Sequence, residues 1–312
     1  MWSKAKKTFR LFSGFNLQKK IIVTGANGFI GSRLTSYLRG HNYKVSAPSF
    51  QLEDYSSYAN LLSSEEWDAV VHLAGVSSYS ACEENPKQAY QTNLGATAML
   101  SELVAKYTPA AQMIFASTSQ VYAPSRDAEV LLTEESLVKP QTVYAKTKYL
   151  AEVAIEATTK VSPLKAAVFR IFNHSHKSQS RDFFLPHVFH ELTSAMGQQQ
   201  ILIKTGNIDL YRDIGDVDDL VRAFEKIIDR SADADSRFEI YNVCNGKPRL
   251  LRDLANELSV ALNKKVAFEV DTARMRAGEP LSIVGSNVKI QNALNWKPAE
   301  LTNRDLIKRF LA

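Results

Sequence analysis

Cysteine is scarce in this chain, which has only Cys82 and Cys244 among its 312 residues. Neither cysteine has the paired spacing of a zinc site or a redox dithiol, so we expect no disulfide framework and no metal site. Long apolar runs are also missing: no stretch approaches the roughly 18 consecutive apolar residues of a membrane-spanning helix. The opening residues lack the central apolar run of a secretory signal, so we expect a cytoplasmic protein without a transmembrane segment.

Acidic residues are absent from the first 20 positions, which hold six lysines and arginines. The formal net charge of the whole chain is +5, so the rest of the chain is close to neutral. This distribution argues against a nucleic-acid-binding face on the fold. Aromatic residues lie among the basic ones in residues 1–19. That pattern is compatible with weak contact with an anionic membrane surface, with an organelle-targeting segment, or with a frayed extension.

What the sequence does contain, from residue 20 to residue 172, is an alternation of short β-branched runs and longer amphipathic stretches. Strands are expected at 21–23, 43–47, 69–73, 113–115 and 166–171, and helices at 29–39, 55–62, 87–106 and 142–158. This order predicts a Rossmann-type, doubly wound α/β fold, with a parallel sheet covered on both faces. The alternation loosens afterwards, so residues 173–312 are expected to form mainly a smaller substrate-binding lobe, with some segments returning to the Rossmann core.

A glycine loop follows the first expected strand and opens the first expected helix, in the segment Thr24–Gly31. Gly25 permits a tight turn, Gly28 lets the backbone approach a pyrophosphate, and Gly31 allows close packing of helix against strand. The free amides and the positive end of the helix dipole then bind the phosphates. This placement predicts a dinucleotide cofactor.

Tyr144 and Lys148 form a Tyr-x-x-x-Lys motif at the start of an expected helix, where the spacing puts both side chains on one face. We expect the ammonium of Lys148 to lower the pKa of the Tyr144 phenol from about 10 toward neutrality. Tyr144 then exchanges a proton with a sugar carbonyl or hydroxyl during hydride transfer, while Lys148 also holds the nicotinamide ribose.

These motifs together resemble the extended short-chain dehydrogenase/reductase family, whose members act on nucleotide-linked sugars. The G-x-x-G-x-x-G spacing, the strand Val71–Gly75 and the Asn-x-x-Gly-like segment at Asn93 carry the resemblance, which covers about residues 20–311. The cofactor-binding residues that it implies are Gly25, Asn27, Gly28, Phe29, Ile30, Gly31, Arg33, Gln51, Leu52, Leu73, Ala74, Gly75, Asn93, Ser117, Tyr144 and Lys148.

The end of the second expected strand bears on the choice between the two nicotinamide cofactors. An acidic residue there normally accepts a hydrogen bond from the ribose 2′-hydroxyl, but residues 45–49 contain no carboxylate. Ser46, Ser49 and Arg33 could instead accommodate a 2′-phosphate, so NADP(H) is favoured and NAD(H) stays an alternative. Gln51 stands where the family usually has an aspartate that touches the adenine.

The resemblance also implies the third catalytic residue. Aligned on Tyr122, the hydroxyl residue of the family falls at Thr118, with Ser117 as the fallback. Family members that are 4,6-dehydratases place acidic residues directly after this position, whereas this chain has Ser119 and Gln120. An amide cannot donate or accept a proton near neutral pH, so the sequence disfavours a dehydratase.

The substrate-binding residues implied by the resemblance are Asn173, His174, Arg212 and Arg276, the two arginines matching those that clamp a pyrophosphate. The segments around 183–186 and 206–217 resemble GDP-4-keto-6-deoxy-D-mannose reductases. The loop at 175–178 departs from their pattern, which leaves the base and the sugar open.

Three functions remain from the sequence: a reductase of a nucleotide-linked 4-keto-6-deoxy sugar, a nucleotide-sugar 4-epimerase, and a non-catalytic NAD(P)-binding sensor or scaffold. The retained Thr118, Tyr144 and Lys148 disfavour the sensor. The resemblance also implies a homodimer, formed through the helices expected at 87–106 and 142–158.

Overall fold

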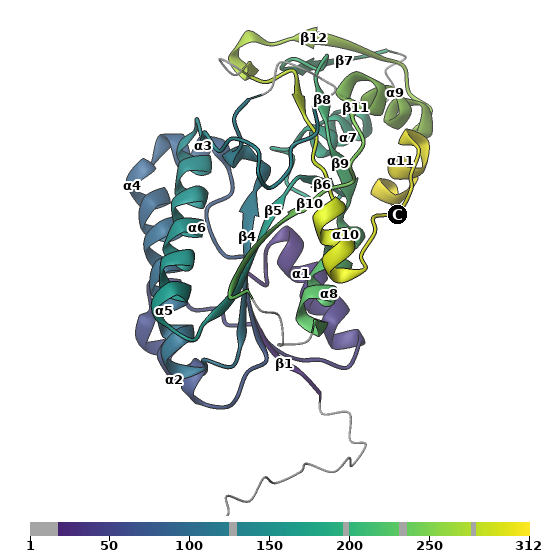
Figure 1. The fold of residues 1–312 in the computed structure, drawn as a ribbon. Helices are drawn as coiled ribbons and strands as arrows, with labels where there is room; N and C mark the ends of the chain where they lie inside the picture. Colours follow the sequence, from purple (N-terminus) through teal and green to yellow (C-terminus); the bar gives the residue numbers. More distant parts are fainter. Residues whose placement is uncertain (1–17, 125–129, 196–199, 231–235, 276–278) are drawn as a thin grey trace, which may run out of the picture.

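A computed structural model of the chain describes residues 18–124, 130–195, 200–230, 236–275 and 279–312. Its centre is a six-stranded sheet with the order β10-β5-β4-β3-β1-β2, in which every neighbouring pair is parallel (Figure 1). This arrangement confirms the predicted Rossmann-type fold class. The strands are β1 Lys20–Thr24, β2 Lys44–Ser46, β3 Ala69–His72, β4 Gln112–Thr118, β5 Lys165–Ile171 and β10 Phe238–Val243.

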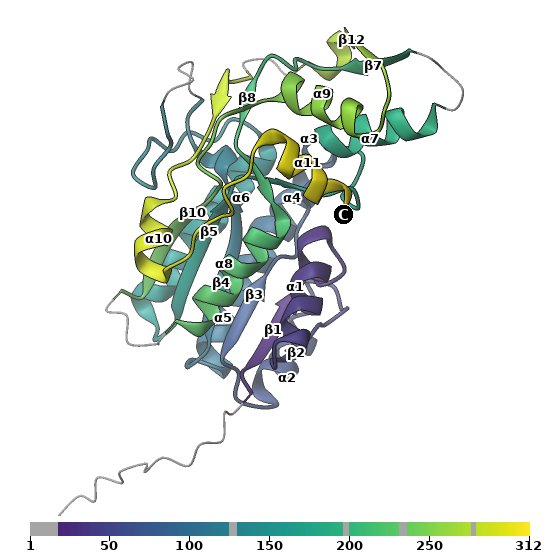
Figure 2. The ribbon, with the colours of Figure 1, turned by 90° about the vertical axis from the view of Figure 1, so that its right-hand side faces the viewer.

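Helices cover both faces of the sheet, because each strand alternates its apolar side chains between two cores (Figure 2). Ile21 and Val23 of β1 point to one core, and Ile22 points to the other. The first face carries α1 Phe29–Gly40, α8 Val217–Asp229 and α10 Val288–Leu294. The opposite face carries α2 Tyr55–Ser63, α5 Thr97–Tyr107 and α6 Val143–Val161.

The helix expected at 87–106 is divided into three pieces. It begins as α4 Pro86–Ala89, widens into the π-helical segment Tyr90–Ala96, and continues as α5. The short helix α3 Tyr79–Glu84 precedes it and was not predicted. Within the described ranges no helix combines the length and the apolar character needed to cross a membrane.

The smaller lobe has its own apolar core and lies beyond one end of the sheet (Figure 1). Its larger elements are α7 Phe184–Ser194, β7 Ile201–Thr205, α9 Leu251–Ala261, β12 Val266–Val270 and α11 Asn303–Leu311. Short strand pairs complete it: β6 Asn173–Ser175 with β9 Ile214–Asp216, and β8 Tyr211–Arg212 between β11 Arg249–Leu250 and β13 Ser282–Ile283.

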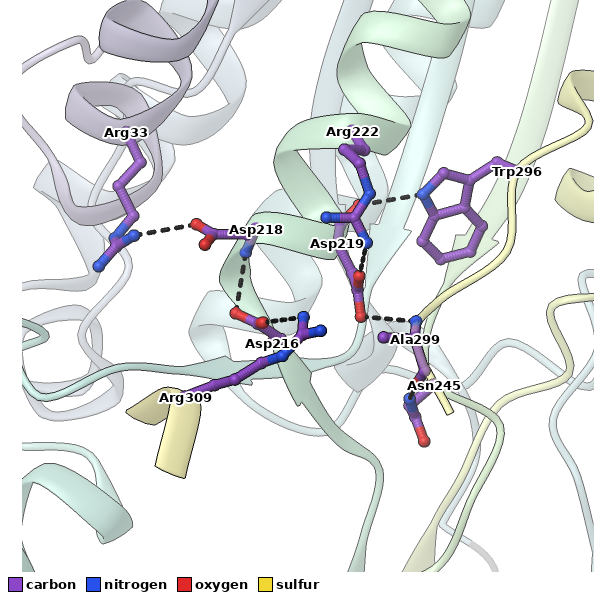
Figure 3. A network of polar contacts seen from close by, with 9 residues as sticks. All are labelled: Arg33, Asp216, Asp218, Asp219, Arg222, Asn245, Trp296, Ala299 and Arg309. Carbon is purple, nitrogen blue, oxygen red and sulfur yellow. Dashed lines mark hydrogen bonds and ion pairs between the residues drawn. The ribbon is translucent and has the colours of Figure 1, made fainter. Parts of the chain in front are cut away.

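The first turn of α8 joins the lobe to the Rossmann core (Figure 3). Asp216 caps this helix. Its carboxylate also forms an ion pair with the Arg309 guanidinium of α11 at 2.7 Å. Asp219 is almost fully buried, and its carboxylate accepts a hydrogen bond from the Ala299 backbone at 3.0 Å. Trp296 donates its indole N–H to the Asp219 carbonyl. The chain after β13 is therefore fixed to the core, which holds the lobe over the sheet.

Candidate active site

The glycine loop is shaped to leave space for a ligand. Gly25 has a φ of +70°, and a Cβ there would come within 2.6 Å of the Ala74 backbone nitrogen. A Cβ on Gly31 would collide with the Gly25 carbonyl, so only glycine allows α1 to begin so close to β1. No side chain caps the first turn of α1 and no acidic residue lies in it. The amides at this helix end therefore suit a phosphate.

A pocket of about 850 Å³ opens beside this loop, at the carboxyl ends of β1, β2 and β3. The strand order reverses between β1 and β3, which is where open α/β sheets bind dinucleotides. Among the predicted cofactor residues, those that line the pocket are Gly25, Asn27, Gly28, Gln51, Leu52, Ala74 and Gly75. These residues fit the adenosine diphosphate half of NAD(P).

Other predicted cofactor residues support the pocket from behind. Phe29, Ile30 and Gly31 form the first turn of α1, and Ile30 and Leu73 pack against the core. Asn93 is buried: its side chain accepts a hydrogen bond from the Val76 N–H at 2.8 Å and donates to the Val76 carbonyl at 3.0 Å. Asn93 thus fixes the loop after β3.

Arg33 points toward the first turn of α8 (Figure 3). Its guanidinium forms an ion pair with Asp218 of α8 at 2.9 Å. Arg33 and Ser46 are not among the residues that line the pocket, whereas Ser49 is.

The catalytic residues predicted from the sequence meet at the carboxyl end of β4. Thr118 is the last residue of β4, and its side chain lies close enough to the hydroxyl of Tyr144, in the first turn of α6, to lower the pKa of that hydroxyl. Thr118 also accepts a hydrogen bond from the Gln120 backbone at 3.2 Å, which fixes its orientation. Lys148 lies one turn further along α6, buried, with its Nζ 4.0 Å from the centroid of the Phe115 ring.

The predicted lowering of the Tyr144 pKa is wrong. Burial of the hydroxyl raises this pKa from 10.0 to about 12, partly offset by the hydrogen bond to Thr118. Burial also lowers the pKa of Lys148 to about 7, against the opposing charge of Glu152. The sequence argument counted the charge of Lys148 and left out the loss of solvent around both groups.

Ser117, the alternative to Thr118, faces elsewhere. Its hydroxyl donates a short hydrogen bond to Glu152 of α6, behind the catalytic residues. Neither Ser119 nor Gln120, the two residues after Thr118, brings a carboxylate to the site.

The predicted substrate residues have different surroundings. Asn173 is exposed at the start of β6. His174 is buried, with Nδ1 2.9 Å from the Phe172 carbonyl oxygen, and burial lowers its pKa to about 4. Arg212 forms an ion pair with Glu279 at 2.9 Å. Arg276 lies outside the described residues.

Several residues near the site were not found from the sequence. The pocket is also lined by Phe50, Glu53, Tyr55, Gln88, Gln91, Thr92 and Gly95. Glu53 accepts a hydrogen bond from Thr92 at 2.9 Å across the pocket wall. These residues follow the second strand or lie in the helical segment after β3. Of them, only Gly95 belongs to a segment that the sequence singled out, the one that begins at Asn93.

Comparison with known proteins agrees with this geometry. The family model described as "NAD dependent epimerase/dehydratase family" matches residues 21–244. The chain is 27% identical to a GDP-6-deoxy-D-mannose reductase of Pseudomonas aeruginosa, over 95% of this chain and 97% of that protein. It is 25% identical to UDP-glucose 4-epimerase 2 of Arabidopsis thaliana, over 90% of this chain and 91% of that one.

Among solved structures, the chain is similar to RMD from Pseudomonas aeruginosa complexed with NADPH. The TM-score is 0.82 at 25% identity, and the match covers 94% of this chain and 98% of that chain. The likeness therefore spans both the Rossmann core and the smaller lobe.

Proposed function

Because this chain belongs to the NAD dependent epimerase/dehydratase family, we propose that it reduces the 4-keto group of a nucleotide-linked 4-keto-6-deoxy sugar with NAD(P)H. One observation carries the proposal: the Thr118 side chain lies beside the Tyr144 hydroxyl at the end of β4, with Lys148 one turn away on α6. This set can move a proton at a carbonyl oxygen.

The nicotinamide, when bound, supplies the hydride that reduces C4. Tyr144 donates its proton to the O4 oxygen, and the Thr118 hydroxyl donates a hydrogen bond to the same oxygen as negative charge develops there. Lys148 holds the nicotinamide ribose and, when protonated, stabilises the phenolate until solvent returns the proton. Ser119 and Gln120 offer no acid or base for water elimination, so the reaction ends at the alcohol.

Tyr144 is protonated at neutral pH in the protein without cofactor, because burial raises its pKa to about 12, and it can therefore donate a proton to a keto oxygen. A reductase and a 4-epimerase both use such a donor, so the choice between them rests on the substrate assay. The 4-epimerase remains the second candidate, because its supporting relatives match the chain over a similar length.

NADP(H) is the proposed cofactor. Ser49 lines the pocket after β2, and residues 45–49 bring no carboxylate that would repel a 2′-phosphate. The relevant measurement is the dissociation constant of NADPH against that of NADH, and tighter binding of NADH would contradict this preference.

The diphosphate of the substrate is proposed to bind Arg212, whose planar guanidinium can donate two parallel hydrogen bonds to it. The diphosphate would replace the Glu279 carboxylate, because both are anions that bind the Arg212 guanidinium. Asn173, exposed at the mouth of the lobe, is the proposed second contact.

A homodimer is proposed to form through α5 and α6. Met99, Leu150 and Val153 are apolar side chains of these helices, and each is more than a third exposed. Two copies that pair these faces would bury them, as a symmetric interface requires.

The function is tested with a panel of GDP-, UDP-, dTDP- and CDP-linked 4-keto-6-deoxy sugars, each incubated with NADPH or NADH and followed at 340 nm. A reductase oxidises one cofactor for every sugar reduced. Sugar isomerisation without net loss of absorbance would establish the epimerase instead, and no reaction with any sugar would return the sensor to consideration.

A further inference from the structure

A buried ion pair lies directly behind the catalytic residues. Glu152 of α6 and Arg170 of β5 contact each other at 2.8 Å, and their side chains are only 2% and 4% exposed. The contact has several points, because the Arg170 Nε also donates to both carboxylate oxygens at 3.2 Å. The guanidinium carbon of Arg170 lies 4.9 Å from the centroid of the Tyr122 ring, which covers its face. Such a pair is held in one geometry.

The pair is connected to the catalytic strand through Ser117. Ser117 and Arg170 are neighbours in the β4–β5 register, and the Ser117 hydroxyl donates to Glu152. The next residue along β4 is Thr118, whose side chain lies beside the Tyr144 hydroxyl and lowers its pKa. Glu152 therefore ties the end of β4 to the same helix that carries Tyr144 and Lys148.

The pair also lies next to Lys148. Glu152 follows Lys148 by four residues on α6, so the two side chains lie on one face of the helix. The other titratable groups around Lys148 are the Tyr144 phenol on α6, the Cys82 thiol on α3 and the His72 imidazole on β3. Burial raises the pKa of the Cys82 thiol and lowers that of His72 to about 3, so both are neutral near pH 7. Glu152 is thus the anion that faces Lys148, with the cation of Arg170 behind it.

We propose that Glu152 and Arg170 are positioning residues, which hold Thr118 against Tyr144 through Ser117 and set the charge of Lys148. The proposal rests on the proposed function, which assigns Lys148 to the cofactor ribose. Glu152 raises the pKa of Lys148, and Arg170 is the cation paired with Glu152, so removal of Glu152 takes away an anion beside Lys148 and removal of Arg170 leaves that anion unpaired. The two removals must therefore act on Lys148 in opposite directions.

Glu152→Gln leaves Arg170 as an unpaired cation, which disfavours the protonated form of Lys148 and lowers its pKa. Arg170→Gln leaves Glu152 as an unpaired anion, which raises the same pKa. One unpaired charge near a buried ammonium is expected to shift the pKa of that ammonium by about one unit. Ser117→Ala removes the hydroxyl and no charge, so it should leave the pKa of Lys148 unchanged while lowering kcat.

The test is the dissociation constant of NADH as a function of pH, measured by isothermal titration calorimetry on the full-length protein. NADH is the probe because it carries no 2′-phosphate that titrates near pH 6. In the wild-type protein, binding should weaken as pH rises through about 7, where Lys148 loses its proton. The midpoint should fall in Glu152→Gln, rise in Arg170→Gln, and stay in place in Ser117→Ala.

The outcomes separate this proposal from the proposed function. If Lys148→Met binds NADH as tightly as the wild-type protein across the pH range, the assignment of Lys148 to the ribose fails. If wild-type binding has the midpoint but the two charge variants leave it in place or shift it in one direction, the positioning role is refuted. A merely structural role would lower the thermal midpoint of both variants without opposite pH shifts. If one of the single variants does not fold, the double variant Glu152→Gln/Arg170→Gln takes its place, because it removes both charges. The pH midpoint of NADH binding in the double variant should lie closer to the wild-type value than the midpoint of the single variant that does fold.

Discussion

Replacing Tyr144 with phenylalanine tests the mechanism at the atom that moves the proton. The substitution keeps the ring and removes the hydroxyl that lies beside Thr118. A positioned general acid contributes about 10²–10⁴-fold to the rate, which corresponds to roughly 3–5 kcal/mol of transition-state stabilisation. The lost hydrogen bond contributes only about 1 kcal/mol to the free energy of unfolding. Activity should therefore collapse while the fold survives.

The assay for Tyr144→Phe is single-turnover hydride transfer at 340 nm with saturating cofactor and the sugar that the panel identifies. Tyr149→Phe is the matched control: it lies on the same helix, is partly buried against the neighbouring apolar cluster, and loses the same hydroxyl outside the catalytic set. We expect the Tyr144 variant to bind cofactor normally, to melt within a few degrees of the wild type, and to turn over about 10²–10⁴-fold more slowly. A folded Tyr144→Phe protein with near wild-type turnover would refute the mechanism.

Three further predictions follow from the described contacts. Because burial lowers the pKa of Lys148 from 10.5 to about 7, the folded state binds fewer protons than the unfolded state above pH 7. Its free energy of unfolding should then rise with pH relative to that of Lys148→Met, and parallel curves in chemical denaturation would contradict this. Arg212→Ala should raise the KM for the sugar nucleotide by about 10–150-fold, because it loses a charge-assisted contact of about 1.5–3 kcal/mol, and the affinity for NADPH should be nearly unchanged. An unaltered KM would contradict the proposal that Arg212 binds the diphosphate. Leu150→Glu/Val153→Glu should convert a dimer to a monomer in light scattering, whereas a monomeric wild-type protein at micromolar concentration would remove the proposed interface.

The Rossmann half of the fold could be predicted because most of its strands and helices are marked by a pattern within their own short stretch of sequence. Each strand from β1 to β5 is a short apolar run flanked by turn residues, and each helix between them has an amphipathic period. The smaller lobe was not predictable in this way. Its strand β8 has two residues, and its partner β13 lies about seventy residues further along the chain, so no local pattern marks it. Likewise β10 returns to pair with β5 after the part of the lobe that contains α7 and β7.

The catalytic set was predictable because spacing along one helix fixes Tyr144 and Lys148, and the family pattern supplies Thr118. What the sequence could not give is the environment of these groups. The pKa of Tyr144 depends on burial by α3 and β4, which are distant in sequence. Glu152 has the helical spacing from Lys148, but its role depends on Arg170, a residue of a different strand that only the folded chain brings within 2.8 Å.

The central claim is that a hydride passes from the reduced nicotinamide to C4 of a nucleotide-linked sugar and stays there. It is tested most directly with NADPH that carries deuterium at both C4 positions of the nicotinamide, incubated with the protein and the nucleotide-linked 4-keto-6-deoxy sugar that the panel identifies. Mass spectrometry of the product should find one deuterium per sugar, bound at C4, with one equivalent of oxidised cofactor formed. Recovery of the keto sugar without deuterium, or of an isomer formed without cofactor oxidation, would contradict the claim.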